Sequence, residues 1–354
     1  MIILKGLTLL PLRLNLRLLS LIPIVLIVGV YTSVDALAKD NTPNIGNSAS
    51  GNYLAGRHAH YNSNSRFAIK YYRTALKETP KNIDLLHKIT TLLVSEGDID
   101  EALPETKRLV KLSNEAYDIP ILILSIVEIK NQKYKKALEY IEKLKKEGLN
   151  TFSVPLLRAW LLAGQKKFNK AIKIIDQKSK NKGTEALFGI HGALISELAG
   201  KPTEAIKRYQ TATNLRGSTN LRSTTLVGNL YERQGQGGNA KMVYDRYNSL
   251  QPGSTIFDSA YKRLISEKKP EPNITIAEDG VAEALFSLAS AVKNQNPFQA
   301  LIFLRLAVYL RPSLTIANLL LAELLDRDDR LKDANLIYRK IVSDPTYNWM
   351  VRLK

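Results

Sequence analysis

The chain has 354 residues, of which 45% are hydrophobic and 24% charged, and it contains no cysteine. This length allows a sizeable buried core, whereas the lack of cysteine excludes disulfides and a lipid attached to an N-terminal cysteine. Fifty-one lysines and arginines against 33 acidic residues give a formal net charge of +18, which suits an anionic partner.

The N-terminus has the pattern of an export signal. Basic residues precede an apolar stretch over 18–30, and Ala36 and Ala38 form the small–x–small ending that signal peptidase accepts. The basic residues are Lys5, Arg13 and Arg17. We therefore expect 1–38 to be a signal peptide and the remainder to be periplasmic. The alternative is an uncleaved inner-membrane anchor, because the uncharged stretch over 18–34 is just long enough to cross hydrocarbon, again with the remainder in the periplasm.

The next segment, 39–50, is rich in Asn, Ser, Gly and Pro and is expected to be a flexible linker. Beyond it, alanines recur at a nearly constant spacing of 34 or 35 residues, with one gap of 60 between the sixth and the seventh. They are Ala68, Ala102, Ala137, Ala171, Ala205, Ala240, Ala300 and Ala334. A period near 34 is typical of stacked helix–turn–helix units, none of which can bury its apolar face alone.

The residues around each alanine identify the kind of repeat. In the first unit, Gly56, Tyr72, Ala75 and Pro80 lie at offsets −12, +4, +7 and +12 from the alanine. The sixth unit repeats this frame with Gly228, Tyr231, Tyr244, Tyr247 and Pro252, and the seventh agrees through Leu304, Ala307 and Pro312. This pattern resembles the tetratricopeptide repeat.

The resemblance implies an all-α fold, a right-handed superhelical solenoid of antiparallel helix pairs with about eight repeats in two subarrays. The first subarray covers 51–253 with six repeats, and the second covers 278–346 with two. Between them, 254–277 is expected to hold an extra helix over 256–266 and a linker that Pro270 and Pro272 keep from being helical. The final residues, 347–354, resemble the incomplete start of a further repeat.

Tetratricopeptide proteins generally bind partners on the concave surface formed by first helices. Counting from each alanine places an apolar floor there, flanked by polar ends, which suits a peptide laid in a groove. The floor residues are Leu122, Ile126, Leu156, Trp160, Ile190 and Leu194; the ends hold Tyr53, Arg57 and Tyr61 on one side and Asn229 and Arg233 on the other. The ordinary alternative is that some of these side chains pack inside the solenoid.

The positive charge is concentrated between residues 130 and 182, where 15 lysines and arginines oppose 4 acids, a local balance of +11. This basic patch could meet an anionic membrane surface or polymer, although a solvated face is the plainer interpretation. Its main members are Lys133, Lys135, Lys136, Lys143, Lys145, Lys146, Lys166, Lys167, Lys170 and Lys173. An exported chain is not expected to meet nucleic acid.

No catalytic, cofactor-binding or metal-binding pattern is present. His58 and His60 point in different directions on a helix, and His87 and His191 lack carboxylates at metal-ligand spacing. We therefore expect a non-enzymatic scaffold of the bacterial cell envelope that binds a peptide or protein in its groove. The alternatives are a membrane-tethered adaptor that uses the N-terminal segment and the basic patch, and a glycan or small-molecule binder.

Overall fold

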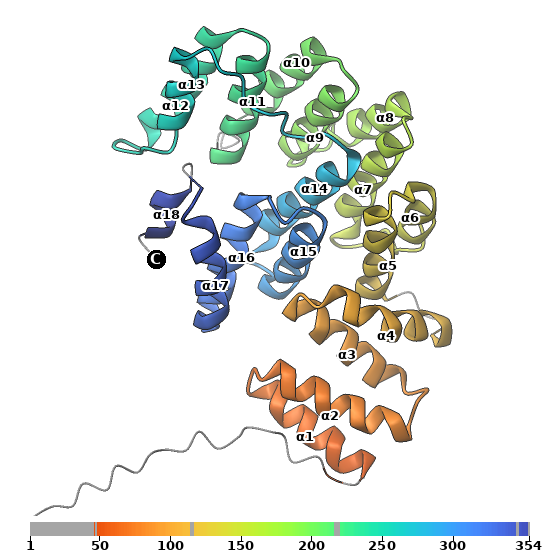
Figure 1. Ribbon diagram of the computed structural model, residues 1–354. Coiled ribbons are helices and arrows are strands. Elements are labelled where there is room, and N and C mark those ends of the chain that lie inside the picture. Colours follow the sequence, from red (N-terminus) through yellow and green to blue (C-terminus); the bar gives the residue numbers. More distant parts are fainter. Residues whose placement is uncertain (1–45, 47, 114–116, 216–219, 345–346, 353–354) are drawn as a thin grey trace, which may run out of the picture. The chain divides into compact units, whose positions relative to one another are not determined.

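The computed structural model describes residues 46, 48–113, 117–215, 220–344 and 347–352. All the regular structure in these residues is helical, and successive helices pack together in pairs, as the repeat period predicts (Figure 1). The predicted export segment over 1–38 and most of the linker over 39–50 lie outside the described residues.

The first run of helices forms six pairs. Their bounds are α1 Ala49–Tyr61, α2 Ser65–Glu78, α3 Ile83–Glu96, α4 Ile99–Leu112, α5 Asp118–Lys130, α6 Tyr134–Ile141, α7 Asn150–Gly164, α8 Phe168–Lys178, α9 Glu185–Leu198, α10 Pro202–Thr213, α11 Leu221–Arg233 and α12 Gly237–Leu250. A short helix, α13 Asp258–Ile265, follows and packs on α12.

The second run holds two further pairs and a short final helix. The bounds are α14 Ala277–Val292, α15 Pro297–Leu310, α16 Thr315–Arg327, α17 Leu331–Ile341 and α18 Asn348–Arg352. The last of these packs on α17, and the adjoining Tyr347 is buried. The described residues therefore form eight helix pairs in two runs.

The alanine ladder explains why successive units stack. Each of the eight alanines lies on the second helix of its pair, and none has more than 1% of its surface exposed. A methyl group at this position lets the neighbouring helix approach closely, and a larger side chain would push it away. The alanine spacing in the sequence therefore reflects a close contact between helices that recurs once in each pair.

The turn inside each pair also repeats. In seven of the eight pairs the residue five positions before the ladder alanine has a positive φ, between +56° and +96°: Ser63, Gly97, Gln132, Lys166, Gly200, Gly235 and Asp329. A left-handed residue at the end of the first helix reverses the chain sharply. The seventh pair differs, because Asn296 instead caps α15 with its side chain.

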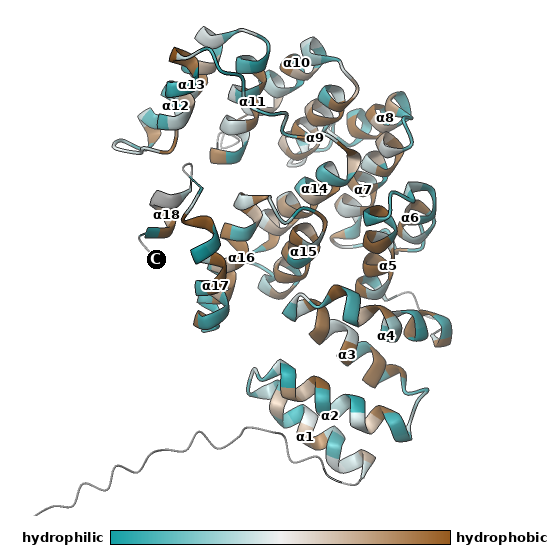
Figure 2. Ribbon diagram, in the orientation of Figure 1, coloured by the Kyte–Doolittle hydropathy of each residue, from teal (hydrophilic) through white to brown (hydrophobic). Residues whose placement is uncertain are grey.

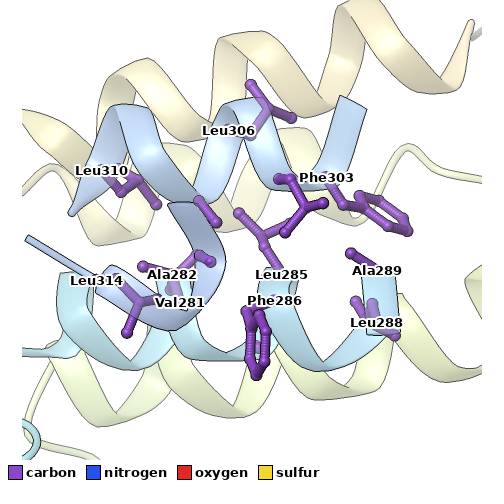
Figure 3. Close-up of a cluster of buried hydrophobic side chains, with 14 of the residues drawn as sticks. Val281, Ala282, Leu285, Phe286, Leu288, Ala289, Phe303, Leu306, Leu310 and Leu314 are labelled. Carbon is purple, nitrogen blue, oxygen red and sulfur yellow. The ribbon is translucent and has the colours of Figure 1, made fainter. Parts of the chain in front are cut away.

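The second run of helices packs against the first. Helix α14 contacts α7 and α9, and α15 contacts α3 and α5 (Figure 1). All four of these partners are first helices of their pairs. Helices α14 and α15 are apolar on nearly every side (Figure 2). A helix of this kind is stable only when other helices bury it on several sides. The shared core of α14 and α15 is a cluster of aliphatic and aromatic side chains that includes Leu285, Phe303 and Leu306 (Figure 3).

Candidate functional site

The apolar floor of the predicted groove lies in the interior of the molecule. Leu122, Ile126, Leu156, Trp160 and Leu194 are between 0% and 5% exposed, and Ile190 is half-buried. Helices α14 and α15 lie on the first helices that carry or flank these residues. The groove centre is therefore occupied by the chain's own second run of helices.

Trp160 is the clearest case of this packing. A Cβ atom placed on Gly280 of α14 would lie 2.0 Å from Cζ3 of the Trp160 ring. Only a residue without a side chain lets α14 approach the indole so closely. Trp160 thus anchors a helix of this chain and is not available to an external peptide.

A polar chain ties the same indole to α9 and back to α14. The Trp160 indole N–H donates to Nδ1 of His191 at 3.1 Å, and Nε2 of His191 lies 3.2 Å from the Ser287 hydroxyl. Because Nδ1 accepts, Nε2 carries the proton and donates to Ser287. Complete burial, with a smaller contribution from the charge of Arg222, lowers the pKa of His191 to about 4 against the opposing charge of Glu283. The imidazole is therefore neutral at ordinary pH.

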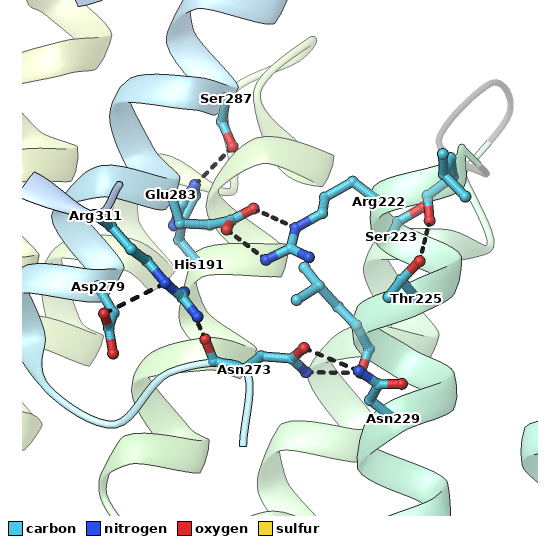
Figure 4. Close-up of polar contacts among 12 residues, drawn as sticks. His191, Arg222, Ser223, Thr225, Asn229, Asn273, Asp279, Glu283, Ser287 and Arg311 are labelled. Atoms are coloured by element: carbon cyan, nitrogen blue, oxygen red, sulfur yellow. Dashed lines mark hydrogen bonds and ion pairs between the residues drawn. The ribbon is translucent and has the colours of Figure 1, made fainter. Parts of the chain in front are cut away.

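A buried ion pair lies beside the histidine (Figure 4). Arg222 of α11 donates to both carboxylate oxygens of Glu283 on α14, from Nε at 2.8 Å and from Nη2 at 2.6 Å, and the Glu283 side chain is 1% exposed. Burial alone would raise the pKa of Glu283, but the charge and hydrogen bonds of Arg222 outweigh it, so the pKa is lowered. The pair holds both ions in a fixed bidentate geometry.

The linker between the two runs joins this polar cluster. Asn273 accepts at its backbone oxygen from Nη1 of Arg311 at 2.8 Å, and its side-chain oxygen accepts from the Asn229 amide at 3.2 Å (Figure 4). Asn229 was predicted to line one end of the groove. It instead holds the linker against α11.

Arg233, predicted at the same end of the groove, also interacts with another residue of this chain. It forms an ion pair with Glu197, a carboxylate that also accepts from the Tyr209 hydroxyl at 2.6 Å. Burial raises the pKa of Glu197 despite the opposing hydrogen bond from Tyr209 and the charge of Arg233. The predicted groove is therefore not open in its middle or at the end formed by Asn229 and Arg233. The positions were counted within each repeat, and such counting cannot reveal a distant segment that packs on the repeats.

Packing inside the helix pairs decides what kind of repeat this is. A Cβ atom on Gly56 would lie 2.6 Å from the Tyr72 ring, and one on Gly228 would lie 2.2 Å from the Tyr244 ring. A small residue on the first helix thus receives a large one from the second, at the same offsets from the buried ladder alanine. The fold is a tetratricopeptide-repeat (TPR) solenoid.

No protein-family profile and no curated protein sequence matches this chain. Among solved structures it is similar to Naa15/Naa10 bound to HypK-THB, with 16% identity over 85% of this chain and 54% of that one, and a TM-score of 0.40. It thus spans about half the length of that chain. It is also similar to MamA protein, with 16% identity over 63% of this chain and 98% of that one, and a TM-score of 0.30.

A third similar structure is the P58(IPK) TPR domain, with 14% identity over 86% of this chain and 95% of that one, and a TM-score of 0.27. These likenesses have low identity and low TM-scores. The assignment to the TPR fold rests on the buried alanine ladder and the glycine–tyrosine packing of this chain.

The other predicted end of the TPR groove remains accessible. Tyr53, Arg57 and Tyr61 follow one another at four-residue intervals on α1, so they share one face of the helix. Tyr61 is 89% exposed, Arg57 is exposed, and Tyr53 is half-buried with its ring 6.0 Å from that of Tyr72. The Lys88 ammonium lies 5.9 Å from the Tyr53 ring. This aromatic and cationic surface, which we call the α1 face, is open to a partner.

The predicted basic patch lies on the surface. All ten of its lysines are exposed, and only Lys136 forms an ion pair within the described residues, with Glu128 at 2.7 Å. They come from α6, α8 and the segments next to these helices. The structure therefore leaves most of this charge available.

The remaining histidines and carboxylates of the described residues form no metal site. Within the described residues, no group of three or more His, Asp or Glu side chains could hold a metal ion. His58 and His60 lie in the last turn of α1, and the His87 ring lies 4.8 Å from that of Tyr117. No helix in the described part of the chain is long and apolar enough to cross a membrane.

Proposed function

We propose that this chain is a non-enzymatic scaffold of the bacterial cell envelope that holds a protein or peptide partner. The observation that carries the proposal is the α1 face, the accessible end of a TPR surface whose middle is filled by α14 and α15. Tyrosine and arginine are the residues that most often dominate interface energetics. Their four-residue spacing suits a partner segment lying along the helix.

The side chains of the α1 face indicate the chemical class of the partner. Arg57 has no carboxylate within ion-pair distance among the described residues, so it can donate to a carboxylate of the partner. The rings of Tyr53 and Tyr61 supply apolar area with a polar tip. An acidic peptide that also carries apolar side chains fits this surface best.

The test is photo-crosslinking from position 61, with position 242 as the matched control. Met242 is 69% exposed and belongs to α12 of the sixth pair, whereas Tyr61 belongs to α1 of the first. A partner captured from 61 and not from 242 is then purified and titrated against the full chain. Arg57→Ala and Tyr61→Ala are each expected to weaken its binding by about tenfold or more, and unchanged binding in both variants would contradict the proposal.

We also propose that the repeats reside in the periplasm, on the basis of the export signal in the sequence. N-terminal sequencing of the mature protein separates the two forms. A start at Lys39 supports the released scaffold, whereas a retained Met1 supports the membrane-tethered adaptor.

A further inference from the structure

One edge of the TPR solenoid carries lysines in register. Lys133, Lys167 and Lys201 are the N-cap residues of α6, α8 and α10, each 34 positions after the one before. Lys166 and Lys170 flank the middle member. Equivalent positions of successive repeats line up along a solenoid. These five residues, which we call the lysine row, therefore lie along the edge where the second helices α6, α8 and α10 begin.

The charge of the lysine row is not neutralised by any ion pair among the described residues. All five side chains are exposed, and none has a carboxylate within ion-pair distance among the described residues. Two acids near the row already form other ion pairs, since Glu128 of α5 pairs with Lys136 and Glu204 of α10 pairs with Arg208. The other exposed lysines of the basic patch extend the same positive potential over α6 and α8.

The residue type narrows the class of partner. The equivalent N-cap positions of α6, α8 and α10 all hold lysine, and none holds arginine, which provides the planar fork that grips a single carboxylate or phosphate. Lysine is depleted in protein–protein interfaces, where its long, hydrated side chain is costly to fix. Flexible lysine side chains instead suit a layer of anionic groups, because attraction to such a layer does not require each ammonium to hold one fixed position.

We propose that the lysine row docks the solenoid on the anionic phospholipid headgroups of a membrane surface. Contact along the edge places three successive repeats on the bilayer at once, so the attraction of the individual lysines adds. The α1 face belongs to the first pair and takes no part in this contact. Docking therefore goes beyond the scaffold function and can succeed or fail independently of it.

The test compares binding of the full chain to vesicles of phosphatidylcholine alone and vesicles that also contain phosphatidylglycerol. The neutral vesicles are the reference, because the apolar stretch over 18–34 can itself enter any bilayer. We expect tighter binding to the anionic vesicles, with the difference lost at high salt. Replacing all five lysines of the row by glutamine is expected to weaken this extra binding by about 3,000-fold, at about fivefold for each lysine.

Glutamine is a conservative replacement here because the chain already uses it at equivalent positions. Gln236 is the N-cap of α12, and Gln132 has a φ of +57°, close to the +60° of Lys166. The matched control makes the same charge change elsewhere, with Lys262, Lys268, Lys269, Lys332 and Lys340, all exposed, replaced by glutamine. Circular dichroism checks that both variants are folded.

Three outcomes overturn the proposal. Equal binding of the unaltered chain to neutral and anionic vesicles rules out headgroup recognition. Equal weakening in the row variant and the control means that net charge acts without the row. Tighter binding of the row to soluble polyglutamate than to anionic vesicles identifies an acidic protein as the partner. Loss of the extra binding to anionic vesicles in the row variant, with its retention in the control, supports the proposal.

Discussion

The contact between Gly280 and Trp160 allows a sharp test of how the second run of helices is seated. In Gly280→Ala the new methyl group would start 2.0 Å from the indole, and it must retreat to at least 3.4 Å for ordinary contact. Such overpacking in a core costs about 1–3 kcal/mol, whereas alanine in place of glycine inside a helix contributes about 1 kcal/mol. The net expectation is that the free energy of unfolding falls by up to about 2 kcal/mol.

The assay is urea unfolding followed by far-ultraviolet circular dichroism, with Gly238→Ala as the control. Gly238 also lies in a helix, but a Cβ atom there would meet nothing within 4 Å, so the same exchange is expected to be neutral or stabilising. In a Trp160→Leu background the penalty of Gly280→Ala should shrink, because the clashing ring is gone. If Gly280→Ala stabilised the protein as much as Gly238→Ala does, α14 would not pack on Trp160.

The polar cluster beneath α14 gives two further predictions. Burial lowers the pKa of His191 to about 4 in the folded protein from an ordinary 6.5, so unfolding takes up a proton between these two pH values. The stabilisation that comes from keeping this imidazole neutral is therefore fully present above pH 6.5 and is lost as the pH falls toward 4. This loss amounts to about 3 kcal/mol, and urea titrations over that range should show a flatter pH dependence in His191→Gln. In Arg222→Ala the buried Glu283 loses its partner, so we expect a loss of about 3–5 kcal/mol in the same assay, whereas Lys241→Ala, which breaks an exposed pair with Asp245, should cost less than about 1 kcal/mol.

The repeat architecture was predictable because each repeat carries its own evidence. The eight alanines are 34 or 35 residues apart within each run, and all of them are buried where helices that are neighbours in sequence pack closely. The helix pairs and the all-α fold follow directly from this local periodicity. The sequence alone therefore sufficed for the part of the fold that is built from neighbouring units.

The groove could not be predicted by the same reasoning. Trp160 and Gly280 are 120 residues apart, and nothing within a repeat reports which distant helix covers it. A signal was nevertheless present in α14 and α15, whose sequences are apolar on nearly every side and therefore need partners beyond their own pair. Glu283 within this apolar stretch was a second signal, because a buried acid needs a cation such as Arg222.

The most direct test of the central claim, that the second run of helices packs back on the first, is an intramolecular crosslink. Arg66 and Lys332 are both exposed and line one cleft of about 450 Å³, although they lie in the first and the last helix pair. The chain has no cysteine, so Arg66→Cys with Lys332→Cys introduces the only two thiols. A short bismaleimide should join them within one chain. It should not join Arg66→Cys to Lys262→Cys, since Lys262 lies on α13, which packs on α12. Equal yields from the two pairs, or no product from the first, would contradict the packing described here.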